Sequence, residues 1–245
     1  MDSGYYAACT ALVSRTEALD TIANNLANAS TVGFRAEHNV FSSVLASASG
    51  ASGSTLNQVI NSFGVLSGTS LDQTQGALQK TGNDLDLGIE GSGYFVVQTA
   101  NGEVYTRNGA FQVSNHGQLT TASGDPVLGD VGPISLPPGK ISISADGTIS
   151  SNGAVTGKLK IVDFPAGTQI TGIGNTYYAA PANTAEAASN SSVRQGMLES
   201  SNVNPVANMV ELVAAQRSTE MMQRALNMFN SEIDKTATQD LPKVS

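Results

Sequence analysis

The stretch Ile22–Arg35 reads IANNLANASTVGFR, and a helical pattern gives way there to a polar exit. Four apolar residues lead into it at a spacing of seven: Tyr5, Leu12, Leu19 and Leu26. Small residues lie four positions after the first three, at Cys9, Thr16 and Ala23. This pattern predicts a helix with a narrow seam that packs against another helix. The alternative is an ordinary amphipathic helix with polar residues on its wet face.

Three asparagines, Asn24, Asn25 and Asn28, interrupt the end of this predicted helix. Asparagine is a mediocre helix former because its amide competes for backbone hydrogen bonds. Beyond them, Gly33 can adopt the left-handed conformation that stops a helix, and Phe34 supplies an apolar anchor. The stretch therefore predicts a helix whose seam has no partner nearby in the sequence.

The composition of the 245-residue chain favours short strands and turns, since only 13% of residues are charged and 25 are glycine. Its formal net charge is −8 and it has no basic cluster, so nucleic acid is not an expected partner. The single cysteine, Cys9, excludes an intramolecular disulfide. No apolar run is long enough to span a membrane, and Met1–Gly4 shows no secretory signal.

The middle of the chain, residues 76–181, is predicted to be β-rich. Runs such as Tyr94–Val97 are bounded by Asn-Gly and Asp-Gly pairs, which suit tight turns. Residues 114–129 and 144–157 share a turn, a short strand and a second turn, so we interpret them as two copies of one hairpin unit. Small polar residues at 46–55 and 182–192 predict linkers on either side.

A second long helix is predicted after Ser201, where Asn204 can cap and Pro205 suits the first helical position. Its apolar stripe comprises Val206, Val210, Val213, Met221, Ala225, Met228 and Ile233. The helix should reach about Lys235, which is roughly 45 Å at 1.5 Å per residue. Because each terminal stripe lacks a local partner, we expect the two helices to pair.

Both ends and the middle resemble one family. NNLANASTVGFR and GMLESSNVNPVANMVELVAAQR look like the terminal signatures of bacterial flagellar axial proteins. GALQKTGNDLDLGIEGSGYFVV (76–97) and YTRNGAFQVSNHGQLTTASGDPVLG (105–129) resemble the β domain shared by rod and hook subunits. The large extra domain of hook subunits is missing. ASTVGFRAE is most similar to the proximal-side rod subunits, with distal rod subunits as the alternative.

This resemblance implies an α+β fold in five parts. Residues 1–35 and 201–245 would supply long N- and C-terminal helices paired in a coiled-coil-like domain. Residues 36–75 would form an extended linker, 76–181 a β-rich outer domain of short strands and hairpins, and 182–200 a returning linker.

The resemblance also implies a role as a structural subunit of the basal-body rod, polymerising helically into a hollow drive shaft. Its partners would be copies of itself, other rod and axial subunits, the basal-body rings and the flagellar export apparatus. Export by that apparatus would place the chain in the periplasmic rod without a cleaved signal. The alternative function is a secreted β-domain that binds cell wall or ligand, with the helices as caps. A polymer needs both termini, whereas a binding module needs only 76–181.

No catalytic, cofactor or metal site is expected. The glycines of Gly88–Gly93 lie between strand-like runs and open no helix, so a tight turn is predicted instead of a phosphate loop. Asp84 and Asp86 provide too few oxygens for a divalent ion. His38 and His116 lack a second ligand at metal-binding spacing.

The expected functional residues are therefore subunit contacts. Amides resist sliding between helices because each buried one needs its own partners. The alternative is that these amides only cap local helix ends. The predicted interface residues are Asn24, Asn25, Leu26, Asn28, Gly33, Phe34, Asn202, Val203, Asn204, Val206, Val210, Val213, Met221 and Met228.

Overall fold

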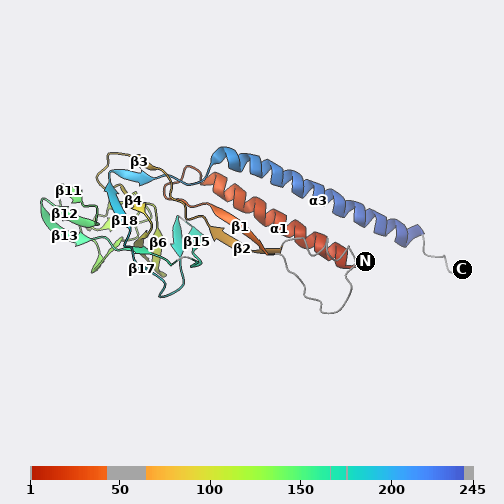
Figure 1. The fold of residues 1–245 in the computed structure, drawn as a ribbon, viewed down its shortest axis with the longest axis horizontal. Coiled ribbons are helices and arrows are strands. Elements are labelled where there is room, and N and C mark those ends of the chain that lie inside the picture. The colour runs from red at the N-terminus through yellow and green to blue at the C-terminus, as the bar shows by residue number, and fades with distance from the viewer. Residues whose placement is uncertain (1, 43–64, 166, 175, 240–245) are drawn as a thin grey trace. The chain divides into compact units, whose positions relative to one another are not determined.

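The computed structural model describes residues 2–42, 65–165, 167–174 and 176–239, which fall into two compact units (Figure 1). Unit 1 comprises Met1–Leu26, Glu37–Thr69 and Asn204–Ser245, and unit 2 comprises Ala27–Ala36 and Ser70–Val203. The linker predicted at 46–55 lies outside the described residues. Neither described helix has a segment long and apolar enough to cross a membrane.

Unit 1 contains helix α1 (Asp2–Ala27), helix α3 (Pro205–Gln239) and the pair of strands β1 (Glu37–Ser42) and β2 (Val65–Leu71). The predicted start of α3 is confirmed. Asn204 Oδ1 accepts hydrogen bonds from the backbone N–H groups of Val206 (3.1 Å) and Ala207 (3.2 Å), and Pro205 is the first helical residue.

The predicted α+β class, with long terminal helices paired in a coiled-coil-like domain, is wrong. The described chain is mainly β, with nineteen strands against the two helices. The α3 stripe expected to form the seam is exposed, with Val206 at 72%, Val210 at 68% and Met221 at 64%. The fold is mainly β because glycine, serine and threonine, which fill much of the sequence, favour short strands and turns over helices.

The buried face of α1 also differs from the predicted seam. Thr16 and Ala23 are exposed, and the buried residues are Ala11, Ser14, Ala18, Ile22 and Asn25. The reason lies at the helix end, where the Asn25 side chain bonds to the backbone of Glu37 in β1. Asn25 Nδ2 donates to the Glu37 carbonyl (2.7 Å), and Asn25 Oδ1 accepts from the Glu37 N–H (2.9 Å). These bonds turn the face one residue away from the predicted seam toward the strand.

Unit 2 is built on an antiparallel six-stranded sheet in the order β15-β16-β6-β5-β14-β17. Its strands are β5 (Tyr94–Thr99), β6 (Gly102–Thr106), β14 (Ile161–Asp163), β15 (Thr171–Gly174), β16 (Tyr177–Ala179) and β17 (Glu186–Ala187). The central strand β5 contributes to both faces, because Phe95 packs in one apolar cluster and Tyr94 and Val96 in another.

Smaller sheets complete unit 2. A three-stranded sheet joins β11 (Ile141–Ile143), β12 (Thr148–Ser151) and β13 (Ala154–Lys158). The two-stranded pairs are β3 (Leu78–Lys80) with β19 (Met197–Glu199), β4 (Leu87–Gly91) with β18 (Ser191–Gln195), β7 (Gln112–Val113) with β8 (Leu119–Thr120), and β9 (Leu128–Gly129) with β10 (Gly132–Pro133). Long-range pairing of β3 with β19 and of β4 with β18 brings the two ends of unit 2 together.

The two predicted hairpin copies are confirmed by their turns. Ser114 N–H donates to the Gln118 carbonyl (2.8 Å) and Gly117 N–H donates to the Ser114 carbonyl (2.8 Å). Ser144 repeats both bonds with Thr148 and Gly147, each at 2.9 Å. The same local sequence therefore makes the same turn twice.

The chain does turn within Gly88–Gly93 and opens no helix there: Gly88 lies inside β4, and Gly91, the last residue of β4, and Gly93 have positive φ (95° and 114°) before β5 begins. Residues 182–200, by contrast, were predicted to be a linker but carry β17, β18 and β19. Their small polar residues pair as antiparallel strands against β14, β4 and β3. Local composition cannot predict such strand pairing, because the partner strands lie far away in the sequence.

Candidate subunit interface and the clasp behind it

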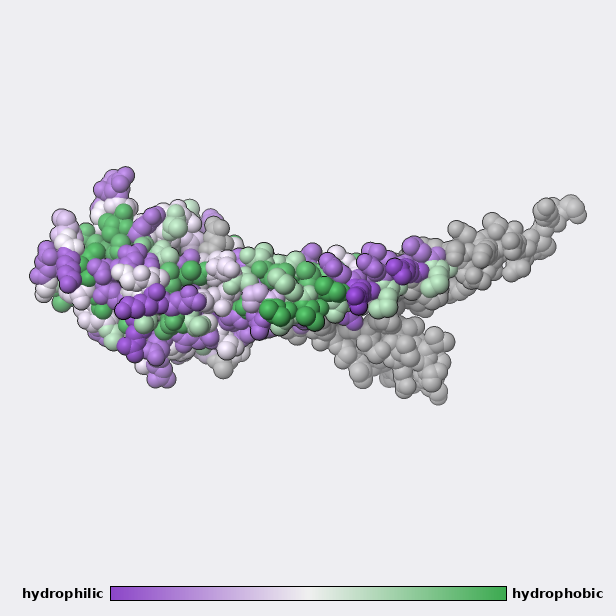
Figure 2. Space-filling model, turned by 90° about the horizontal axis from the view of Figure 1, so that it is seen from above, coloured by the Kyte–Doolittle hydropathy of each residue, from purple (hydrophilic) through white to green (hydrophobic). Residues whose placement is uncertain are grey.

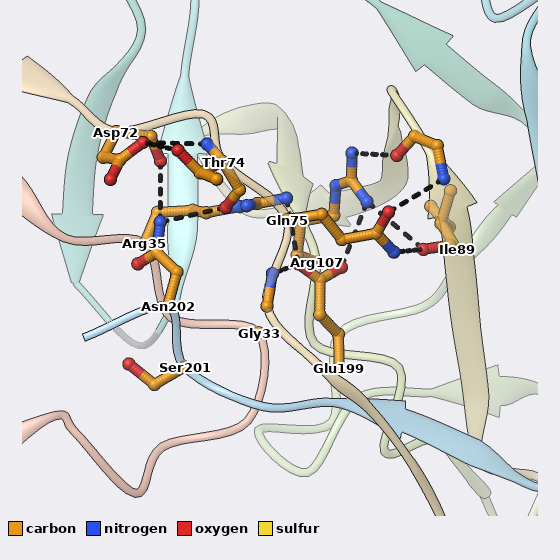
Figure 3. Close-up of polar contacts among 12 residues, drawn as sticks. Gly33, Arg35, Asp72, Thr74, Gln75, Ile89, Arg107, Glu199, Ser201 and Asn202 are labelled. Atoms are coloured by element: carbon orange, nitrogen blue, oxygen red, sulfur yellow. Dashed lines mark hydrogen bonds and ion pairs between the residues drawn. The ribbon is translucent and has the colours of Figure 1, made fainter. Parts of the chain in front are cut away.

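Three segments of unit 2 meet around the carboxylate of Glu199, as Figure 3 shows. Glu199 Oε1 accepts from Arg35 Nη2 (2.9 Å) and from the backbone N–H of Gly76 (3.0 Å). Glu199 Oε2 accepts from Arg107 Nη1 (3.0 Å). The side chains of Arg35, Arg107 and Glu199 are only 1–3% exposed. We call these three residues the clasp.

Local structure places each member of the clasp. Gly33 has φ +69° and donates its N–H to the Glu199 carbonyl (2.8 Å), which aligns the residues after α1 with the end of β19. The predicted left-handed glycine is therefore confirmed. Arg107 follows directly after β6, and its Nη2 donates to the Gly91 carbonyl (2.8 Å).

The clasp buries two cations with one anion. Because burial disfavours its charged form, the pKa of the Arg107 guanidinium is lowered, although the charge of Glu199 opposes that shift. The Arg107 guanidinium carbon lies 5.2 Å from the ring centroid of Tyr94, a favourable cation–π arrangement. Arg35 Nε and Nη1 and Arg107 Nε have no hydrogen-bond partner among the described residues. Glu199 therefore carries most of the compensation for both buried charges.

Asn202 joins two of these segments, those that contain Arg35 and Gly76 (Figure 3). Its Oδ1 accepts from the Ala36 N–H (2.7 Å), and its Nδ2 donates to the carbonyls of Asp72 (3.1 Å) and Thr74 (3.0 Å). Tyr178 adds a further link, because its buried hydroxyl accepts from the Arg35 N–H (2.9 Å) and donates to the Gly33 carbonyl (3.2 Å). Each joined segment lies close to a point where the chain passes into unit 1.

The predicted interface residues fall into two groups. Those near the clasp are engaged within the chain: Asn25 bonds to β1, Asn202 bonds to two segments, and Asn204 caps α3. Asn24 is exposed, Leu26, Asn28 and Phe34 are partly buried, and Gly33 and Val203 are buried. The second group comprises Val206, Val210, Val213, Met221 and Met228, which are 47–72% exposed.

This second group and Met209 lie on one face of α3, and we call these apolar residues the outer stripe. At about 100° per residue, spacings of three and four place these side chains on one side of the helix. Figure 2 shows hydrophobic residues gathered over the first turns of this helix. The opposite side carries Leu212, Thr219, Met222 and Leu226, which are buried or partly buried. The helix therefore has one face used within unit 1 and another left exposed.

The clasp was not predicted from the sequence. Arg35, Arg107 and Glu199 stand inside the quoted stretches ASTVGFR, YTRNGAF and GMLESSN, yet we considered only the amides and apolar residues beside them. The sequence did hold one signal for the clasp, which is that charged residues are rare. Only 13% of the chain is charged, yet each of these three separate motifs contains one of the three clasp residues. Their pairing depends on tertiary structure and could not be read from spacing.

Unit 1 has a helix face with exposed apolar side chains, and unit 2 is closed by a buried ion-pair clasp; both features suit a structural assembly subunit. No group of His, Cys, Asp and Glu in the described part of the chain is arranged to hold a metal ion. The comparisons with known proteins identify the family. Three family descriptions match: "Flagella basal body rod protein" at residues 6–35, "Flagellar hook protein FlgE/F/G D1 domain" at 88–155, and "Flagellar basal body rod FlgEFG protein C-terminal" at 194–239.

Full-length relatives agree. The flagellar basal-body rod protein FlgF of Mesorhizobium japonicum is 35% identical over 96% of this chain and 96% of its own. FlgF of Escherichia coli is 36% identical over 93% and 94%, and the rod protein FlgG of Bacillus subtilis is 34% identical over 86% and 92%. The chain belongs to the flagellar basal-body rod protein family, as the sequence resemblance predicted. The matches favour the proximal over the distal rod assignment.

The chain is accordingly a structural subunit of the flagellar basal-body rod, and it assembles with other rod components. These relatives are named as rod proteins and not as enzymes. The alternative of a secreted binding module gains no support from them.

Proposed function

We propose that this chain polymerises helically through α3, and that its outer stripe is covered by a neighbouring subunit in the rod. The observation that supports this is the exposure of Val206, Val210, Val213, Met221 and Met228, at 47–72%, on one helix face. Contiguous exposed apolar patches are uncommon on monomers and mark interaction surfaces. Burying one such side chain contributes about 1.5–3 kcal/mol, so several together can hold subunits in a polymer.

In the finer proposal, the polymer is a hollow drive shaft in the periplasm that transmits torque and passes export substrates. The export apparatus delivers the chain without a cleaved signal, and the basal-body rings surround the assembled shaft. We propose no catalytic role. Residues 76–181 are proposed as the outer domain, with 1–35 and 201–245 as the inner parts of each subunit.

The outer stripe is tested by Val210→Asp, assayed by motility and by the amount of protein recovered in purified basal bodies. A charge on the stripe should abolish incorporation, because burying an unpaired carboxylate is strongly unfavourable. Val155→Asp is the matched control, since it makes the same exchange at a valine of β13 that is 72% exposed and lies in unit 2. Normal incorporation of the Val210→Asp chain would reject the proposal.

The remaining predicted contacts stay predictions: Asn24, Asn25, Leu26, Asn28, Gly33, Phe34, Asn202, Val203 and Asn204. Asn25→Ala and Asn202→Ala separate a subunit contact from a role within the chain. A subunit contact predicts a folded monomer that fails to assemble. A role confined to the chain predicts a less stable monomer whose assembly falls only as its stability does.

A further inference from the structure

A cleft of about 340 Å³ lies within unit 1, between α1, β1 and α3. Small side chains line much of it, including Ala18 on α1 and Ala214, Ala215 and Ser218 on α3. Small residues of this kind let another helix approach closely.

Two carboxylates line the cleft together with Arg15 and His38. Glu37 and Glu211 both line it, and neither forms an ion pair within the described part of the chain. Burial raises the pKa of the half-buried Glu37 carboxyl. Arg15, which also lines the cleft, is ten residues along α1 from Asn25, the partner of Glu37, or about 15 Å at 1.5 Å per residue.

The outer stripe carries the complementary charge. Glu220 and Arg224 lie on the same face of α3 and pair with each other (3.8 Å). Arg217 is exposed and falls in register between Val213 and Met221. Among the described residues it forms no ion pair. An unpaired cation on the outer stripe and two unpaired carboxylates in a small-residue cleft are chemically matched.

We propose that the outer stripe of α3 in one copy of this chain packs into the cleft between α1, β1 and α3 of the next copy, with Arg217 pairing with Glu37 and Glu211. This rests on the proposed function and names the partner of the outer stripe. The contact joins two different surfaces of the same molecule, so it is head-to-tail. Repetition of a head-to-tail contact that does not close gives an open helical filament, the form a rod requires.

Charge exchange tests the pairing. Arg217→Glu should lower incorporation into basal bodies about tenfold or more, because like charges brought together cost several kcal/mol. Adding Glu211→Arg to that variant should restore incorporation and motility. Glu17→Arg with Arg217→Glu is the matched control. It has the same net charge, but Glu17 is an exposed α1 residue outside the cleft. Glu37→Arg is a second rescue variant. Glu211→Arg comes first because Glu211 is exposed, so replacing it carries little risk of misfolding.

Rescue by Glu211→Arg but not by Glu17→Arg supports the proposal. If neither rescues, or both do equally, the specific pairing is wrong. The Val210→Asp experiment tests separately whether the outer stripe is a subunit contact. A failure of the Arg217 pairing can therefore be distinguished from a failure of the proposed function.

A covalent test identifies the partner. In a Cys9→Ala background, Arg217→Cys and Glu211→Cys should give oxidation products at multiples of the 25.1 kDa chain mass in basal bodies. Adducts of any other mass would mean that a different rod subunit fills the cleft, and would overturn the proposal.

Discussion

Glu199→Gln is the perturbation that probes the clasp most directly. Glutamine keeps the size of the side chain and one carbonyl oxygen, but it removes the charge that faces Arg35 (2.9 Å) and Arg107 (3.0 Å). Two guanidinium groups at 1% and 3% exposure would then lack a counter-charge in unit 2. Water cannot replace that charge without opening the structure.

The expected loss follows from the burial. Breaking a buried ion pair by removing one partner costs about 3–5 kcal/mol, because an uncompensated charge remains inside. For a domain of this size, about 1 kcal/mol lowers Tm by roughly 2–4 °C, so a fall of about 10 °C is expected.

Thermal unfolding of the full chain, followed by near-ultraviolet circular dichroism of its tyrosines, measures this change. The matched control is Glu90→Gln, which removes an Arg194 ion pair of 2.7 Å whose side chains are about half exposed. A pair at the surface contributes about 1 kcal/mol or less. If the two variants shift Tm equally, the clasp does not stabilise unit 2 in the way argued above.

Three further outcomes are expected. Gly33→Ala should destabilise more than Gly82→Ala in urea unfolding, because both have similar positive φ (69° and 79°) but only at Gly33 would the added Cβ meet backbone, at 2.3 Å. If the two variants lost equal stability, the positive φ alone would account for the loss, and the close backbone contact at Gly33 would not contribute. Tyr178→Phe should cost about 1–3 kcal/mol. Burial raises the pKa of the Tyr178 hydroxyl in the folded chain, so this hydroxyl contributes its full stability below pH 10. That stability is lost as the pH rises through the folded-state pKa. In alkaline titration the Tyr178→Phe variant should therefore lose less stability than the parent. Asn202→Ala should expose the Ala36 amide to faster hydrogen exchange, and unchanged protection there would contradict its bonding role.

Local features of the fold were predictable because their causes are local. The Asn204 cap, Pro205 at the first helical position, and the positive φ of Gly33 follow from the conformational limits of those residue types. The repeated serine turns at Ser114 and Ser144 follow for the same reason. The family was predictable because three motifs stand in the same order as in its members.

Features that depend on distant partners were not predictable. The strands within residues 182–200 form only because β3, β4 and β14 offer free edges. The outer stripe was predicted as apolar, but periodicity does not say whether a helix face meets its own chain or another. The clasp has the same character, since Arg35 and Glu199 are brought together by the fold and not by spacing.

The clasp also constrains when unit 2 can fold. Gly76 and Glu199 are 123 residues apart, and Ala36 and Asn202 are 166 apart, so these contacts close long loops. Loop closure loses chain entropy before any contact compensates for it, and folds dominated by distant pairings form in milliseconds to seconds. A chain that emerges from its N-terminus must therefore wait for its final strands before the buried arginines find their carboxylate. Until those strands are present, the loops of unit 2 stay open and its two buried cations lack their counter-charge.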